Sequence, residues 1–172
     1  MSLRFFIAVV GFLICLLASC AGYRPGGTKP PSLADVKTIR IEMFSNSTQH
    51  PRASAIATSA VADAMLRDGT YRIGSLDDAD AILEGDLTRI EYQAIRGSRL
   101  DSLFPEELSS TVSLTWRLLD ARDPSRVLAS GYSQGRSQLF VSANLQTARN
   151  NALPEALERA GESLVSRIAN GF

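Results

Sequence analysis

The chain has 172 residues with equal numbers of basic and acidic side chains, and its formal net charge at pH 7 is zero. A hydrophobic content of 45% is enough for a packed core and excludes a wholly disordered protein. The balanced charge creates no overall field that would steer the protein to nucleic acid, so we expect no nucleic-acid partner.

The N-terminus has the pattern of a signal peptide. A short basic start, residues 1–4, precedes an apolar run at 5–17 that is too short for a bilayer span of ~20 residues. The run ends in Leu17-Ala18-Ser19-Cys20, which resembles the lipobox of bacterial lipoproteins. There the small residues give the peptidase access to the scissile bond, and the thiol carries a diacylglycerol. We predict cleavage after residue 19 and a lipid anchor on Cys20; the alternative is an ordinary secretory signal with Cys20 free.

Lipidation of Cys20 determines the state of both cysteines and where the tether and the domain begin. Cys15 lies in the cleaved peptide, so the mature chain has no free thiol and no disulfide. Residues 20–34 are rich in Pro and Gly, which indicates a lipidated flexible tether. We expect residues 35–172 to form a single domain. Ala21, where an Asp would favour inner-membrane retention, is compatible with the outer membrane.

The first part of the domain predicts a strand, a loop and a helix. Residues 36–44 alternate apolar and polar side chains, which is typical of a strand, and the turn-forming residues 45–51 follow. Residues 52–68 place an Ala-rich apolar stripe at helical spacing and end at Gly69, a favoured C-cap residue.

The rest of the domain predicts further strands and a closing helix. Residues 71–73 are a short strand or the start of one, and strands are expected at 81–95, 108–121 and 126–141. The alternation changes phase between Leu87 and Ile90, which indicates a bulge or a twist. Gly85 indicates a close backbone approach, which we expect from the first helix. Residues 143–170 are helical, with a kink or a fresh start at Pro154. The order β-α-β-β-β-α predicts an α+β two-layer sandwich, in which two helices cover one face of a mixed sheet of about four strands.

Catalytic and metal-binding patterns are missing from the sequence. The single histidine, His50, lies in a turn-rich loop, and no second His or free Cys accompanies it to form a zinc site. No serine lies in a nucleophile-elbow motif. Asp77, Asp78 and Asp80 lack the spacing of a calcium-binding loop. We therefore expect no enzyme activity, no cofactor and no metal, and a function carried by surfaces.

Three short motifs, in their order along the chain, resemble the LptE family of lipopolysaccharide-assembly lipoproteins. They are the Cys/Gly-Tyr start (Cys20, Gly22, Tyr23), the Phe-x-Asn-x-Thr segment (Phe44, Asn46, Thr48) and the Ala-Asp-x-x-Leu-x-Gly segment (Ala79, Asp80, Leu83, Gly85). One departure is Ala21, which is inserted between the cysteine and Gly-Tyr.

The resemblance implies a function. LptE-like proteins are lipid-anchored at the outer membrane, on the periplasmic side, and plug the lumen of the β-barrel LptD. They support assembly of that barrel, export lipopolysaccharide with it to the cell surface, and are thought to bind lipopolysaccharide. Two alternatives remain: a periplasm-facing scaffold or regulator of a cell-wall synthase or secretion complex, and a carrier of a small amphiphile.

Arginine side chains are the candidates for lipopolysaccharide contacts, because a guanidinium fork matches the geometry of phosphate. The candidates lie in the 96–107 loop and around the last hairpin: Arg96, Arg99, Arg117, Arg122, Arg126 and Arg136.

Overall fold

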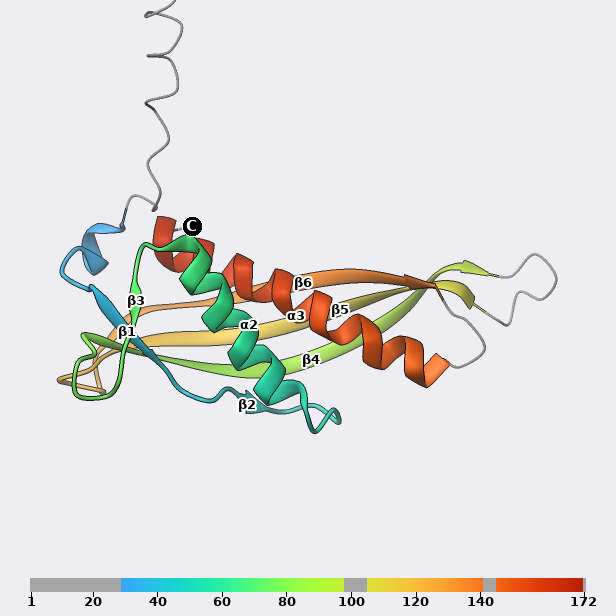
Figure 1. Cartoon of the computed structure of the whole chain (residues 1–172), viewed down its shortest axis with the longest axis horizontal. Helices are drawn as coiled ribbons and strands as arrows, with labels where there is room; N and C mark the ends of the chain where they lie inside the picture. The colour runs from blue at the N-terminus through green and yellow to red at the C-terminus, as the bar shows by residue number, and fades with distance from the viewer. Residues whose placement is uncertain (1–28, 98–104, 141–144, 172) are drawn as a thin grey trace, which may run out of the picture.

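The computed structural model describes residues 29–97, 105–140 and 145–171. Along the chain these contain the 3-10 turn η2 (Pro31–Leu33), strands β1 (Thr38–Ile41) and β2 (Ser45–Asn46), helix α2 (Ala53–Asp68), strands β3 (Arg72–Ile73), β4 (Ala81–Gly97), β5 (Pro105–Asp120) and β6 (Val127–Phe140), and helix α3 (Leu145–Asn170). Figure 1 shows both helices in front of the sheet, so the predicted α+β sandwich is confirmed.

The sheet is mixed and has six strands, where the sequence predicted about four. Its order is β3-β1-β4-β5-β6, with β2 also paired to β4. β1 runs parallel to both of its neighbours, whereas β4, β5 and β6 are antiparallel. The count differs because the predicted strand 36–44 separates from β4 after Ile41. The chain rejoins β4 at Ser45 as β2, and β3 adds a short strand at the edge.

The core lies between the helices and one side of the long strands. On β5, the alternate residues Val112, Leu114, Trp116 and Leu118 are all buried, while Arg117 between them is exposed. The helices contribute many small residues to this layer, and Gly161 of α3 lies against the α2 backbone at Ala60. The small side chains thus allow the two helices to pack closely against each other.

Glycines mark the closest contacts between elements. A Cβ at Gly135 of β6 would meet the α3 backbone at Ala156 and Ala160. At Gly85 the neighbour is the ring of Phe44, so the expectation that α2 would approach Gly85 was wrong. The reason is the separation of β1 from β4, which lets Phe44 turn into the core.

Local signals fix the boundaries and irregularities of the elements. Gly69 caps α2 in the left-handed conformation, with φ 73°, and its N–H bonds to Met65 O. The register of β4 and β5 shifts between Leu87 and Arg89, which confirms the predicted bulge. α3 is one helix with Pro154 inside it, so no second helix starts there.

The chain enters the domain beside the C-terminal end of α3 (Figure 1). Lys29 Nζ donates to Val36 O at 2.7 Å and lies 4.7 Å from the centroid of the Tyr71 ring. Leu33 is buried, so the last residues of the predicted tether pack on the domain. Cys20, Gly22 and Tyr23 lie outside the described residues. Within the described ranges, no helix combines the length and the apolar character needed to cross a membrane.

Candidate interaction surface

The side of the sheet that the helices leave uncovered is lined mainly by polar side chains. One face of an antiparallel sheet commonly faces water while the other packs on the core. We call this side of β4, β5 and β6 the open face. Its described side chains include Glu84, Asp86, Thr111, Thr115, Arg117, Tyr132, Gln134, Arg136 and Gln138.

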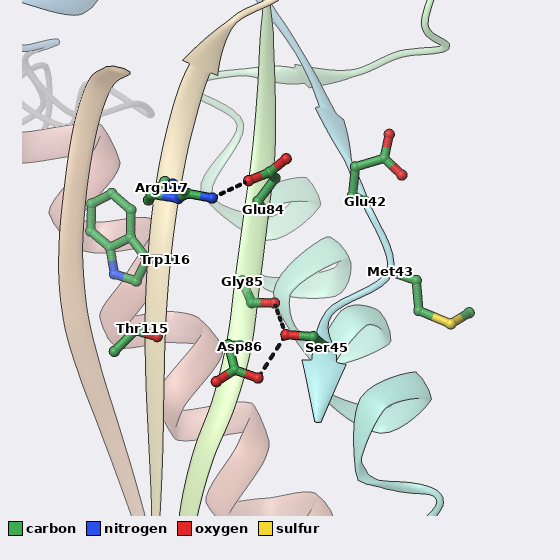
Figure 2. A pocket seen from close by; sticks show the side chains of 9 residues that line it. All are labelled: Glu42, Met43, Ser45, Glu84, Gly85, Asp86, Thr115, Trp116 and Arg117. Carbon is green, nitrogen blue, oxygen red and sulfur yellow. Dashed lines mark hydrogen bonds and ion pairs between the residues drawn. The ribbon is translucent and has the colours of Figure 1, made fainter. Parts of the chain in front are cut away.

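A hollow of about 550 Å³ opens on this face, where the chain between β1 and β2 runs apart from β4 (Figure 2). Its lining combines three carboxylates, from Glu42, Glu84 and Asp86, with the guanidinium of Arg117. Each charged group has a partner. Arg117 Nη2 lies 2.9 Å from Glu84 Oε2, Glu42 pairs with Arg40 at 2.7 Å, and Ser45 Oγ donates to Asp86 Oδ1 at 2.6 Å.

The wall of the hollow forms because Phe44 occupies the gap beside Gly85. The Phe44 N–H bonds to Thr58 Oγ1 at 3.0 Å, and Ser54 Oγ donates to Phe44 O. The ring is thus held on the helix side of the sheet, while Met43 points outward and is 72% exposed. The hollow therefore combines paired charges with one exposed apolar side chain, a set of groups suited to a protein surface more than to catalysis.

The candidate arginines within the described residues lie in three separate places. Arg117 and Arg136 are on the open face, and Arg136 Nε lies 3.4 Å from Thr111 Oγ1. Arg122 and Arg126 are exposed in the β5–β6 turn, where Arg126 pairs with Asp120 at 3.5 Å. Arg96 lies near the end of β4, in register with Glu107 of β5, and Arg99 lies outside the described residues.

Asp80, from the third sequence motif, is an organising residue near the β5–β6 turn. Its Oδ2 accepts the backbone N–H groups of Lys37 at 2.9 Å and Thr38 at 3.0 Å. These two hydrogen bonds lower the pKa of Asp80, and the charges of Arg122 and Lys37 act in the same direction. The carboxylate thus holds the start of β1 against the start of β4.

Asn46, from the second motif, fixes the loop that leads into α2. Its side-chain oxygen accepts the Thr48 N–H at 2.9 Å and the Thr48 hydroxyl at 2.7 Å, and its Nδ2 donates to His50 O at 2.8 Å. The loop is held by the side-chain hydrogen bonding that makes Asn common in turns. Asp80, Asn46 and Gly85, from the second and third motifs, thus each have a structural role near the junction of β1, β2 and β4.

Metal-binding geometry is not found in the part of the chain that the structure describes: no group of three His, Cys, Asp or Glu side chains is placed to hold an ion.

The functional class of the domain follows from the protein family that its sequence matches. The model of the LptE lipopolysaccharide-assembly family matches residues 36–168, nearly the whole folded domain. The chain belongs to the LptE family. That family consists of non-enzymatic lipopolysaccharide-assembly lipoproteins.

Several solved structures share the fold of this LptE-family chain. Protein XCC0632 from Xanthomonas campestris has a TM-score of 0.55 and 18% identity, over 84% of this chain and 92% of that one. Lipoprotein B from Nitrosomonas europaea has a TM-score of 0.51 and 12% identity, over 86% of this chain and 88% of that one. A minor lipoprotein from Acinetobacter baumannii has a TM-score of 0.52 and 7% identity, over 77% of this chain and 92% of that one. At these identities the likeness concerns the fold alone. No curated protein sequence matches the chain.

Proposed function

We propose that the protein is an outer-membrane lipoprotein, anchored through Cys20, that plugs an LptD-like β-barrel and supports its assembly in lipopolysaccharide export. The observation that carries the proposal is the family match, which extends over residues 36–168. The predicted anchor and tether precede this region and supply the attachment that such a plug needs.

The surface of the domain is compatible with the lumen of a barrel. The interior of an outer-membrane barrel is polar. The open face presents hydroxyl, amide and paired charged groups, and the chain as a whole has no net charge. We therefore propose that the open face meets the barrel wall, where neutral hydrogen-bonding groups and paired charges can be solvated or bonded.

Co-purification tests the partner. The full-length lipidated protein, extracted in mild detergent at native expression, is expected to recover a large β-barrel protein. A lipoprotein that is confined to the periplasm and carries the same affinity tag serves as the control. Repeated recovery of a cell-wall synthase or a secretin, with no barrel, would reject the plug and favour the scaffold alternative.

Direct lipopolysaccharide contact is the finer part of the proposal, and the arginines of the β4–β5 hairpin and open face carry it. Arg136 is better placed than Arg117, because Arg136 Nε bonds to a neutral hydroxyl while Arg117 is paired with a carboxylate. Charge reversal at Arg96, Arg99 and Arg136 together is expected to weaken lipopolysaccharide binding without unfolding. Reversal at Arg24, Arg52 and Arg72 is the matched control. Unchanged binding in the first triple variant would reject these sites.

A further inference from the structure

A second cavity, of about 390 Å³, lies on the helix side of β4 and is distinct from the open face. It is an open hollow bordered by the 47–50 loop, by β4 from Thr88 to Tyr92, and by Arg149 of α3. No carboxylate is among the residues that line it in the described part of the chain. The lining residues instead include His50, Arg149 and several residues with hydroxyl groups, which can all donate hydrogen bonds.

Arg149 is the central group of this cavity. Its guanidinium carbon lies 5.0 Å from the centroid of the Tyr92 ring, a cation–π contact that holds it in place. Its Nε is shielded from solvent, and among the described residues no acceptor lies within hydrogen-bond distance of it. The neighbouring His50 Nε2 is 3.5 Å from the Tyr92 hydroxyl. The cavity thus brings an arginine whose Nε has no partner among the described residues and an imidazole to the same tyrosine.

Among the described residues, the carboxylates near this cavity have other partners. Arg89 pairs with Glu91 at 3.2 Å on the exposed side, and the Asp86 carboxylate is engaged by Ser47 Oγ at 3.1 Å. The first turn of α3 has no acidic residue, although an arginine near a helix N-terminus is disfavoured by the helix dipole. A bound anion would satisfy the guanidinium.

We propose that this cavity binds a phosphate group, with Arg149 and His50 as its principal donors. A phosphate oxygen can accept from the Arg149 fork while a second oxygen accepts from the imidazole N–H. The phosphate can come from a phosphorylated glycolipid or from free phosphate. Only the first source rests on the proposed function in lipopolysaccharide export.

The experiment uses the full lipidated chain in detergent and two probes. One is inorganic phosphate, followed through the His50 imidazole resonances by NMR. The other is a bis-phosphorylated glucosamine-disaccharide glycolipid in micelles, compared with its dephosphorylated form. Arg149→Gln is expected to lower the affinity for the phosphorylated glycolipid at least about tenfold, because a charge-assisted hydrogen bond is lost. Arg72→Gln, an equal charge change on the edge strand β3, is the control and is expected to leave the affinity unchanged.

The outcomes separate the site from the source of its ligand. If Arg149→Gln binds both probes as tightly as the native chain, or Arg72→Gln loses as much affinity, the site is rejected. If inorganic phosphate moves the His50 resonances but the phosphorylated glycolipid does not bind, the site stands and the glycolipid source is rejected. Arg149→Lys keeps the charge without the planar fork, and its intermediate affinity would support the site if Arg149→Gln does not fold.

Discussion

At the scale of single residues, the motif positions that suggested the family are structural. Asp80 bonds to two backbone N–H groups of the β1 start, Asn46 fixes the loop before α2, and Gly85 makes room for Phe44. All three act at the junction of β1, β2 and β4. Short motifs of this kind identify a fold, because the geometry of the junction requires those side chains, and they do not locate a binding site.

Asp80 gives a prediction about stability and pH. Its pKa is lowered by the Lys37 and Thr38 N–H groups, so the ionised form stabilises the fold above the carboxyl's unfolded-state pKa of about 3.9. That contribution is lost as the pH falls through the lower pKa of the folded state. Asp80→Asn is expected to reduce the free energy of unfolding at pH 7 by about 1–2 kcal/mol, measured by urea denaturation. The difference from the native chain should shrink below about pH 4.

Asp77→Asn provides the control for this measurement, because Asp77 is an exposed residue of the neighbouring turn. It should leave the urea midpoint unchanged. If Asp80→Asn matches the native chain at pH 7, or if its deficit is the same at pH 3 and pH 7, the carboxylate does not stabilise the β1 start as argued.

At the scale of elements, periodicity predicted the long strands and both helices because their buried faces repeat every second or fourth residue. Periodicity could not predict that β1 and β2 are separate strands, since the separation depends on where Phe44 packs. Nor could it group the candidate arginines, which are close in sequence but divided between the open face and two opposite hairpin ends. Arg149 was missed because its donors become significant only when α3 places it over Tyr92.

The contact of α3 with β6 gives an element-scale prediction. A Cβ at Gly135 would meet main-chain atoms of Ala156 and Ala160, which cannot rotate away as a side chain can. Gly135→Ala is therefore expected to move α3 off the sheet and to lower the free energy of unfolding by about 1–3 kcal/mol in chemical denaturation. Gln138→Ala, on the open face of the same strand, should change it by less than about 0.5 kcal/mol. An alanine variant at Gly135 as stable as the native chain would mean that the two layers are not in such close contact.

At the scale of the whole molecule, the predicted anchor sets how far the domain can move from the bilayer. The segment 21–28 spans at most about 30 Å when fully extended. Its attachment at Cys20 would confine the domain to a thin layer at the membrane. Linking two components in this way raises their effective concentration without any new contact. The anchor should therefore matter most when the protein is scarce.

A comparison of two expression levels distinguishes the contribution of the lipid anchor to barrel binding from that of the folded domain. A Cys20→Ser chain exported by a cleavable secretory signal without a lipobox is expected to incorporate no radioactive fatty acid and to leave the membrane fraction. At native expression it should recover less barrel than the lipidated chain. Strong overexpression should restore recovery, because mass action then replaces the tether and the folded domain still carries the contact surface.

Undiminished recovery at native expression would show that the tether contributes nothing to association. Continued acylation of Cys20→Ser would contradict the lipidation site itself. A loss of recovery that overexpression fails to restore would place the barrel contact in the lipidated N-terminus, and the open face would then not be the surface that meets the barrel.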